Sequence, residues 1–394
     1  MVTQNTQIDK RVQPLIGDIT SWRHELHQHP ELEFDVHRTA EFVASKLRSF
    51  GVDEVVEGIG KTGVVGVIKG QTSDSDLVVG LRADMDALPI TEATQLQYAS
   101  TVDGKMHACG HDGHTAMLLG AAKVLAQSRR FNGTVVVIFQ PAEEAGAGGR
   151  EMVNDGLMDR FNIQQVFGMH NLPNMPLGHF GVRAGPIMAA ADIFHVTIEG
   201  VGGHAAMPQY AIDTTLVASQ IILSLQSIAS RNVDPMESVV VSVTSVHSDG
   251  DNYNVIPQTV TIKGTVRTLS PAIQDQTENR FHDIVEHTAK AMGATAKIVY
   301  TRDYPCTVNS VEEADFAGRV ASKVVGAEQV DVEITPMMGA EDFSFMLNAR
   351  PGAFIFVGNG KSASLHHPKY DFNDEAIQYG CSYWTSIVET AMPL

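Results

Sequence analysis

Short apolar runs that alternate with helical patterns limit the folds open to this chain more than any other feature. Three such runs are too brief to form helices, namely Val64–Ile68, Leu77–Leu81 and Thr134–Phe139. Between the last two, apolar residues recur on one helical face, at Met117, Leu118, Ala121, Val124 and Leu125. Strands that alternate with helices indicate βαβ units and a mostly parallel sheet. We expect two later runs, Gln165–Met169 and Ala353–Val357, to be further buried strands.

The middle of the chain has a different pattern. Strand-like segments and two helical stretches follow one another in the order β-α-β-β-α-β, at Phe194–Ile198, Thr214–Ser230, Ser238–Val246, Thr259–Thr268, Pro271–Met292 and Thr295–Tyr300. This order is the ferredoxin-like pattern. The predicted fold class is therefore α/β, with a mixed, mostly parallel sheet flanked by helices. Residues 1–183 and 305–394 would form the main domain, and residues 184–304 an inserted ferredoxin-like α+β domain.

The charge and cysteine content of the chain exclude several kinds of protein. The 394 residues include 28 Lys and Arg against 46 Asp and Glu, a formal charge of −18. This balance argues against partners such as nucleic acid and anionic membranes, which recruit basic surfaces. No window approaches 18 uninterrupted apolar residues, and the segment MVTQNTQIDK lacks the apolar core of a signal peptide. Three scattered cysteines, Cys109, Cys306 and Cys381, fit a reducing compartment, so we expect a cytoplasmic protein.

Polar side chains of a few chemical types follow the predicted strands where each strand ends. In an open α/β sheet, ligands bind outside the carboxyl ends of the strands. These ends carry Asp84, Asp86, Glu143, Glu144, His170, His366 and His367, and the string HACGHDGH at 107–114 opens the intervening helix. One such pair alone is commonly a helix cap or a turn, but the convergence of all of them favours a functional site. Thiolate, imidazole and carboxylate together suit zinc, manganese, cobalt or nickel, whereas calcium would not select Cys and His.

Seven motifs carry a family resemblance that covers nearly the whole chain. In order they are LRADMDALPI, MHACGHDGHTAMLLGAAK, FQPAEEAGAGG, MHN, GVGGHAAMP, NVIP and LHHPKYDFNDE. Together they resemble the aminoacylase–carboxypeptidase G type of dinuclear metallo-hydrolase, and more narrowly its hippurate hydrolase and indole-acetyl-amino-acid hydrolase branch. The resemblance implies a catalytic metal-binding domain that carries an inserted lid or dimerisation domain. That division agrees with the two patterns described above.

The resemblance also implies roles for particular residues. The ligands of two divalent metal ions (Zn, Mn, Co or Ni) would be Cys109, His111, Glu144, His170 and His366. Glu143 would be the general base, which takes a proton from the attacking water and passes it to the leaving amine. Asp86 would orient a metal-bound histidine. His366 is preferred to His367 because the family motif places its ligand directly after the Leu.

Other histidines and one carboxylate receive no ligand role. The wider family usually begins its metal site with His-x-Asp, whereas this chain has Asp84-Met85-Asp86, so no ligand role is carried to Asp84. His27 and His29 belong to a stretch that precedes Pro30 and follows no strand, so we expect them to be structural. His107 and His114 flank the ligands, and packing or support of the ligands is the expected role.

The inserted domain contributes three candidates of its own. His204 follows two glycines and resembles the family histidine that reaches the site of a neighbouring subunit and stabilises the tetrahedral oxyanion. Asn254, in the motif NVIP, and Arg267, in a predicted strand, are candidates for binding the substrate carboxylate. For Arg267 the alternative is an ordinary strand cation on the surface.

The predicted function is metal-dependent hydrolysis of the amide bond of an N-acyl amino acid, either hippurate-like or N-acetylated. A dipeptidase or carboxypeptidase of the same fold is an alternative, and it would need an acidic group to bind the substrate amine. Glu341 and Asp342 leave that alternative open. A non-catalytic metal-binding protein is the third hypothesis, although it would have no need of Glu143. We expect a small-molecule substrate and a homodimer or higher homo-oligomer formed through the lid domain.

Overall fold

Two compact units make up the structure. The computed structural model describes residues 7–72 and 74–394, so the first six residues of the segment MVTQNTQIDK lie outside the described residues. Unit 1 comprises the described residues up to Ile187 together with Val308–Thr335 and Asp342–Leu394, and unit 2 comprises Met188–Thr307 and Pro336–Glu341. Pro336–Glu341 belongs to unit 2 because the Ala189 N–H donates to the carbonyls of Met337 (3.1 Å) and Gly339 (2.8 Å). The domain boundaries expected from the sequence stay a prediction. They place residues 1–183 and 305–394 in one domain and residues 184–304 in the other.

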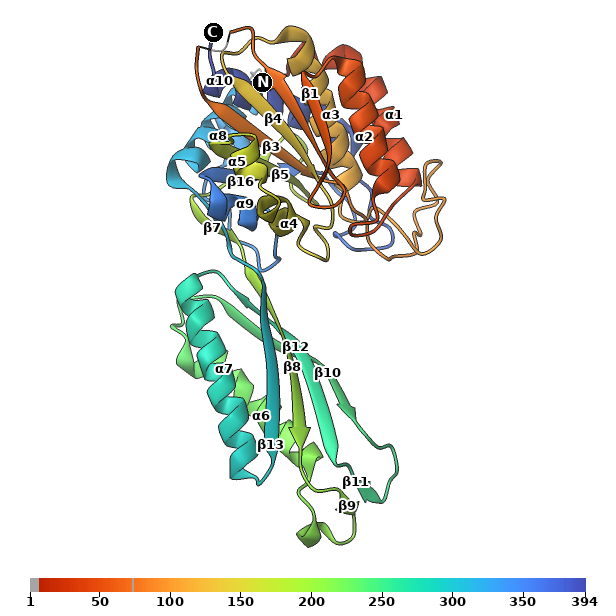
Figure 1. Ribbon diagram of the computed structural model, residues 1–394, viewed down its shortest axis with the longest axis vertical. Coiled ribbons are helices and arrows are strands. Elements are labelled where there is room, and N and C mark those ends of the chain that lie inside the picture. Colours follow the sequence, from red (N-terminus) through yellow and green to blue (C-terminus); the bar gives the residue numbers. More distant parts are fainter. Residues whose placement is uncertain (1–6, 73) are drawn as a thin grey trace. The chain divides into compact units, whose positions relative to one another are not determined.

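An eight-stranded sheet forms the centre of unit 1 (Figure 1). In spatial order its strands are β1 (Glu54–Ile59), β2 (Gly63–Lys69), β4 (Thr134–Gln140), β3 (Val78–Asp84), β5 (Gln165–Leu172), β16 (Gly352–Gly358), β6 (Phe180–Gly181) and β15 (Val330–Asp331). The four central strands, β4, β3, β5 and β16, are parallel to their neighbours in that group, whereas β1, β2 and β4 pair antiparallel. Strands β3 and β16 are buried along their whole length, as expected for a sheet covered on both faces.

Helices cover this sheet and complete the core of unit 1. They are α1 (Ile16–Gln28), α2 (His37–Phe50), α3 (His111–Ser128), α4 (Gly148–Asn154), α5 (Leu157–Arg160), α8 (Val311–Val325), α9 (Ser344–Ala349) and α10 (Ile377–Ala391). Helix α3 is buried on nearly all sides, because α1, α2 and α10 pack around it. A buried helix of this kind can present polar residues at its first turn to an interior site. Among the described residues, no helix is both long enough and apolar enough to cross a bilayer.

Unit 2 has the predicted ferredoxin-like order. Its elements are β8 (Ala190–Glu199), α6 (Thr214–Ser227), β10 (Val239–Ser248), β12 (Thr259–Thr268), α7 (Pro271–Ala291) and β13 (Thr295–Tyr304), and the strands form an antiparallel sheet in the order β10-β12-β8-β13. Helices α6 and α7 lie on one face of this sheet (Figure 1) and enclose a second apolar core. Asp213 caps α6 by accepting the N–H groups of Thr215 and Leu216, and Ser270 caps α7 just before Pro271.

Short pairings complete the fold. Strand β9 (Gly203–His204) pairs with β11 (Val255–Ile256) as a separate two-stranded ribbon in unit 2. A second small ribbon joins β7 (Gly185–Met188) and β14 (Thr307–Asn309). The architecture confirms the predicted fold class, a mostly parallel α/β sheet with an inserted ferredoxin-like part.

Candidate metal centre

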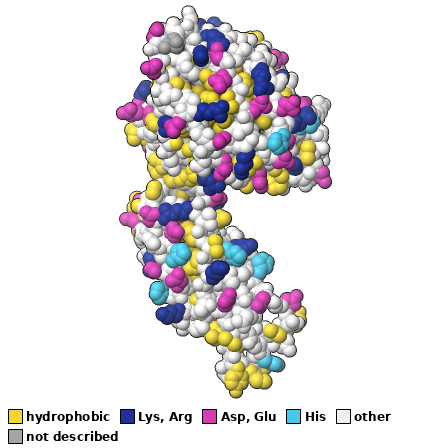
Figure 2. Space-filling model, viewed as in Figure 1, with side chains coloured by type: hydrophobic (Ala, Val, Ile, Leu, Met, Phe, Trp, Pro, Cys, Tyr) yellow, Lys and Arg dark blue, Asp and Glu magenta, His cyan; other side chains and the backbone are white. Residues whose placement is uncertain are grey.

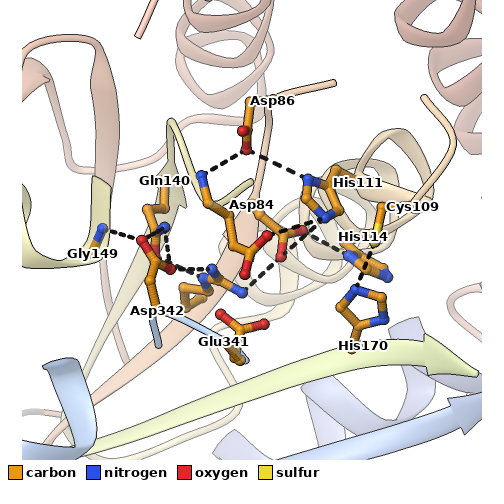
Figure 3. A network of polar contacts seen from close by, with 12 residues as sticks. Asp84, Asp86, Cys109, His111, His114, Gln140, Gly149, His170, Glu341 and Asp342 are labelled. Atoms are coloured by element: carbon orange, nitrogen blue, oxygen red, sulfur yellow. Dashed lines mark hydrogen bonds and ion pairs between the residues drawn. The ribbon is translucent and has the colours of Figure 1, made fainter. Parts of the chain in front are cut away.

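The carboxyl ends of the central strands bring the predicted ligands together. Asp84 ends β3, Glu143 and Glu144 follow β4, His170 lies near the end of β5, and His366 follows β16. Because these strands are parallel, their carboxyl ends share one edge of the sheet. Figure 3 shows Asp84, Asp86, Cys109, His111, His114 and His170 with their polar groups directed toward one another at this edge.

All five predicted ligands form one connected group in unit 1. Cys109 Sγ lies 3.4 Å from His170 Nε2, and His366 Nε2 lies 3.4 Å from Glu144 Oε2. Donor atoms of Cys109, Glu144 and His366 fall within 4.8 Å of one another. His111 Nε2 is 3.9 Å from Glu144 Oε1, so Glu144 lies between His111 and His366. This donor set has the composition expected for a borderline metal.

Two buried polar atoms at the centre of this group indicate that a cation belongs there. His111 Nε2 and Glu144 Oε1 are buried, and neither makes a hydrogen bond to any of the described residues. Buried polar atoms are nearly always hydrogen-bonded or bound to an ion. Both atoms face the same space, since they are 3.9 Å apart. The donor set therefore fits a metal centre on its own geometry.

The charges around His111 lead to the same conclusion. Burial opposes protonation of this imidazole, yet the carboxylates of Asp84 and Asp86 raise its pKa to about 10. Burial and the nearby Glu144 carboxylate raise the pKa of the Cys109 thiol well above its usual value. The pocket thus holds an excess of negative groups that calls for positive charge, which divalent cations would supply while stabilising the thiolate.

Asp86 supports both the predicted base and a predicted ligand. Its Oδ1 accepts the backbone N–H of Glu143 (2.9 Å), and its Oδ2 accepts the backbone N–H of Glu144 (3.1 Å). The same Oδ1 lies 3.4 Å from His111 Nδ1, which leaves His111 Nε2 directed at the pocket. One buried carboxylate therefore orients the histidine and holds the loop that carries both glutamates.

The loop of Glu143 and Glu144 has an unusual backbone. Ala142, just before the pair, has a left-handed φ of 53°. His366, in a different loop, is also left-handed, with a φ of 63°. Gly148 closes the loop through a hydrogen bond from its N–H to the Ala142 carbonyl (3.0 Å). A Cβ on Gly148 would stand 1.7 Å from the Pro141 carbonyl oxygen, so only glycine fits. Non-glycine residues in this region cluster at functional sites, where the surrounding structure holds them.

Asp84 has a different task from its neighbour Asp86. Its Oδ1 lies 2.6 Å from His114 Nδ1, and its Oδ2 accepts a hydrogen bond from the buried guanidinium of Arg82 (2.7 Å). Arg82 also donates to Asp342 (3.0 Å). Sequence reasoning left the role of Asp84 open and missed Arg82, because these roles also depend on His114 and Asp342, which lie 30 and 260 residues away along the chain.

His114 lies close enough to His111 and His170 to be counted among possible ligands, but its two ring nitrogens are already used. Nδ1 bonds Asp84, and Nε2 accepts the backbone N–H of Asn171 (2.9 Å). Both ring nitrogens of His114 thus have partners within the protein, which fits the expected role of supporting the ligands; that role stays a prediction.

His27, one of the two N-terminal histidines expected to be structural, is buried among charged side chains. His27 Nδ1 contacts Asp112 Oδ2 at 2.8 Å, and the buried Arg23 lies 3.4 Å from the same oxygen. Burial opposes protonation of His27, but the Asp112 carboxylate raises its pKa to about 9. Burial lowers the pKa of His107 to about 3, so this imidazole is neutral. These contacts fit a structural role for His27.

The predicted residues of unit 2 fall at two ends of its sheet. His204 lies on β9, opposite Val255 of β11, and the Ala205 N–H donates to the Asn254 carbonyl (2.9 Å). Arg267 lies near the other end of β12, paired in register with Ala191. Thr259 is the first residue of β12 and follows β11 closely in the chain. Thr259 and Arg267 are separated by about 26 Å at the usual strand rise. Within one chain, Asn254 and Arg267 therefore do not meet at one small carboxylate.

Comparison with known sequences gives a family match. The family described as peptidase family M20/M25/M40 matches residues 80–390. Hippurate hydrolase of Campylobacter jejuni is 43% identical over 95% of this chain and 96% of its own length. N-acetylcysteine deacetylase of Bacillus subtilis is 38% identical over 94% of this chain and 95% of its own length.

Comparison with solved structures agrees. The YXEP protein of Bacillus subtilis, described as a dinuclear metal binding peptidase from the M20 family, superposes with a TM-score of 0.83 at 34% identity. The match covers 96% of this chain and 99% of that protein. The similarity therefore extends over both units.

Proposed function

This chain belongs to peptidase family M20/M25/M40 and is a metallo-amidohydrolase, and we propose that it hydrolyses the amide bond of N-acyl amino acids. The products would be a carboxylic acid and a free amino acid. The observation that carries the proposal is the pair Glu143–Glu144, held side by side on one Asp86 carboxylate at the edge of the donor group.

The two glutamates are suited to different work. Glu144 lies between His111 and His366, at 3.9 and 3.4 Å, and is placed as a ligand. Glu143 Oε2 lies 4.0 Å from His111 Nε2, at the edge of the same pocket. We assign Glu143 as the general base, which takes the proton of the attacking water and delivers it to the leaving nitrogen.

We assign the metal ligands as Cys109, His111, Glu144, His170 and His366. Two divalent cations held by these residues would supply an acidified water and polarise the scissile carbonyl. The protein residues keep the donors in place: Asp86 directs His111, and the His170 Nδ1 bonds the Asn171 carbonyl at 2.7 Å, which leaves His170 Nε2 directed at Cys109. The mixture of one thiolate, three imidazoles and one carboxylate suits Zn, Mn, Co or Ni.

We place substrate recognition in unit 2. Arg267 is half-buried on the sheet face opposite the helices and would bind the substrate carboxylate. His204 is placed to donate a hydrogen bond, because its Nδ1 accepts the Ala206 N–H (3.1 Å) and its proton therefore lies on Nε2. This tautomer supports the proposed role of His204 in stabilising an oxyanion.

The separation of Arg267 from His204 and Asn254 supports a site shared between two chains. One chain would supply Arg267, and the partner would supply His204 and Asn254. Strand β10 is an edge strand of the unit 2 sheet, with no pairing on its outer side among the described residues. Figure 2 shows hydrophobic side chains gathered at the end of unit 2 that carries β9 and β11, where the exposed apolar residues are Val201, Met207, Tyr210, Tyr253 and Val255. We therefore propose a homodimer formed through unit 2.

A dipeptide is a less suitable substrate than an acyl amino acid. Asp342, one of the two acidic residues that would bind a substrate amine, is fully buried and already accepts three donors. These donors are Arg82 (3.0 Å), the Gln140 side chain (2.7 Å) and the Gly149 N–H (2.7 Å). The similarity to hippurate hydrolase favours a hippurate-like substrate, and the similarity to N-acetylcysteine deacetylase favours an N-acetyl amino acid.

A hydrolysis screen tests the proposal. The full-length protein, reconstituted separately with Mn, Co, Zn or Ni, is offered hippurate, N-acetyl amino acids, N-acetyl-diaminopimelate and unblocked dipeptides, and the released amino acid is measured. We expect turnover of acyl amino acids with at least one metal and slower turnover of dipeptides. Preferential cleavage of dipeptides would favour the peptidase alternative, and hydrolysis of neither class would overturn the proposal.

A further inference from the structure

Asn171 connects two of the proposed metal ligands and is itself fully buried. Its side-chain Nδ2 donates to the backbone carbonyl of Cys109 at 2.7 Å. Its own backbone carbonyl bonds the Nδ1 of His170 at 2.7 Å. The thiol of Cys109 and the Nε2 of His170 are 3.4 Å apart, at the centre of this arrangement. One residue therefore contacts both members of the Cys109–His170 pair of proposed ligands.

The orientation of the Asn171 amide is determined by its neighbours. The Tyr370 hydroxyl donates to Asn171 Oδ1 (2.7 Å), while Nδ2 faces two acceptors, the Cys109 carbonyl and His114 Nε2 (3.0 Å). Reversing the amide would place an oxygen opposite both acceptors, so the alternative orientation is strongly disfavoured. The amide has one stable orientation, and that orientation supports Cys109.

His114 and Asp84 fix the position of the Asn171 amide through hydrogen bonds. Because His114 Nε2 accepts from both the backbone N–H and the Nδ2 of Asn171, its proton lies on Nδ1, which donates to the Asp84 carboxylate at 2.6 Å. Asp84 in turn is bound to the buried Arg82. These contacts form a continuous buried chain from the centre of β3 to the backbone of Cys109.

The turn at Gly110 packs tightly against the Asn171 side chain. Gly110, between Cys109 and His111, has a left-handed φ of 93°. A Cβ there would lie 2.4 Å from Asn171 Nδ2 and 2.5 Å from the Tyr370 hydroxyl. The turn that separates the Cys109 ligand from the His111 ligand is thus built directly against the Asn171 amide.

We propose that Asn171 is a positioning residue of the metal centre, which holds the Cys109 turn and the His170 ring so that Sγ and Nε2 lie together where they would hold a cation. The inference rests on the proposed function, because it assigns Asn171 a task toward ligands proposed there. It extends that function by naming the residue that sets the geometry of the thiolate–imidazole pair. Residues that orient metal ligands typically alter metal affinity about 10- to 100-fold when replaced.

Cobalt binding to the purified full-length protein tests this role without relying on activity. Co(II) bound to a thiolate gives a sulfur-to-metal charge-transfer band in the near ultraviolet, and competition with a chelator gives the affinity. We expect Asn171→Asp and Asn171→Ala to bind Co(II) about 10- to 100-fold more weakly, with a weakened or shifted band. Tyr370→Phe keeps both donors of the amide and should have a smaller effect.

Asn309→Ala is the matched control. Asn309 is an equally buried asparagine of unit 1 with three hydrogen bonds, to the Arg183 carbonyl and to the N–H and carbonyl of Phe354, and none of these partners is a proposed ligand. This variant should lose thermal stability but keep the affinity and the band of the wild type. If Asn171→Asp does not fold, Asn171→Ala and Tyr370→Phe answer the question.

The outcomes separate the two proposals. Absence of a thiolate band in the cobalt-loaded wild type would overturn Cys109 as a ligand and with it the proposed set of five ligands. A normal wild-type band, together with Asn171 variants of unchanged affinity and unchanged spectrum, would overturn only the role of Asn171. Equal losses in Asn171→Ala and Asn309→Ala would reduce Asn171 to a general contributor to stability.

Discussion

Asp86 Oδ1 accepts the backbone N–H of Glu143 at 2.9 Å, so the proposed base is held by a carboxylate 57 residues earlier in the chain. The other oxygen of Asp86 accepts the N–H of Glu144, and His111 approaches within 3.4 Å. The position of the base, of one ligand and of the ring of another thus depends on one buried side chain. Changes to this side chain and to its surroundings should therefore have distinct, measurable effects.

Replacing Asp86 with Asn should weaken the site without unfolding the protein. An amide keeps one acceptor but presents its NH₂ group to an N–H donor, so one of the two backbone contacts is lost. We expect kcat and metal affinity to fall about 10- to 100-fold. Metal content by elemental analysis and kcat with the best substrate of the screen measure the effect. Wild-type values for both would contradict the assigned role.

Variants of Glu143 and Glu144 should distinguish the loss of catalysis from the loss of bound metal. Glu143→Gln removes the proposed base and should lower kcat about 100- to 10,000-fold while bound metal is retained. Glu144→Gln, its neighbour on the same loop, should lose metal as well as turnover. Stoichiometry and single-turnover rates of the two variants are compared side by side. Unchanged hydrolysis by Glu143→Gln would end its assignment as base.

Removal of the metal should destabilise the protein. Without cations, the buried His111 Nε2 and Glu144 Oε1 have no compensating partner among the described residues. We expect dialysis against a chelator to lower the midpoint of thermal unfolding and to abolish turnover, with both restored by added metal. Alkylation should also label Cys109 faster in the metal-free protein. Cys306 and Cys381, both buried away from the proposed ligands, provide the internal comparison.

His27 should make stability depend on pH. Its pKa is about 9 in the folded protein against an ordinary value of 6.5, so the protonated form is favoured by folding. This contribution is present in full below about pH 6.5 and is lost as the pH rises through 9. Asp112, Glu92 and Arg23 are the charged groups that face it, and the neutral His107 lies beside it.

Replacement of His27 tests this dependence. We expect the wild type to lose about 1–3 kcal/mol of unfolding free energy between pH 6.5 and 9.5 through this group. His27→Gln should be less stable at pH 6.5 and should lack most of that loss. His29→Gln, whose side chain is more exposed, is the control. Parallel pH curves for wild type and His27→Gln would contradict the assignment.

Mixed dimers test whether His204 acts on the partner. His204→Ala and Glu143→Gln are each expected to be inactive, but a mixed dimer would contain one site with both groups intact. We expect partial recovery: a mixed dimer has one intact site of two and should reach about half of the wild-type rate, so a random mixture, about half of which is mixed dimers, should reach about a quarter. Recovery is measured after unfolding and joint refolding, with mixed dimers isolated by two affinity tags. Verified mixed dimers without recovery would show that His204 does not act across chains.

Much of the fold could be predicted because it depends on local patterns. The buried strand β3, the helix α3 and the order of elements in unit 2 follow from hydrophobic period and segment length. The antiparallel pairing of β2 with β4 could not be predicted in this way, since nothing in Val64–Ile68 indicates the direction of its neighbour. Pro336–Glu341 joins unit 2 through hydrogen bonds to Ala189, far away along the chain.

In the site as well, features set by local sequence position could be predicted, whereas roles that depend on distant residues could not. The strand ends and the first turn of α3 could be singled out from sequence position, whereas the choice of five ligands among their residues came from the family resemblance and stays a prediction. Asn171 follows one of these ligands, yet its role depends on Cys109 and on Tyr370, which is 199 residues away. Asp84 and Asp86 differ by two positions and have unlike partners, a difference that no spacing reveals.

The sheet of unit 2 acts as a spacer of defined length. Arg267 and the β9–β11 ribbon stand at opposite ends of β12, so the distance between two proposed recognition groups is counted in strand residues. Loss of two residues from β12 would shorten that distance by about 7 Å and keep every side chain on its face. Loss of one residue would turn Arg267 toward the helices. Insertions and deletions in this strand are therefore constrained in two ways: the number of residues added or removed must be even, and the length of the strand must be kept. Neither constraint applies to loop residues such as Gly250.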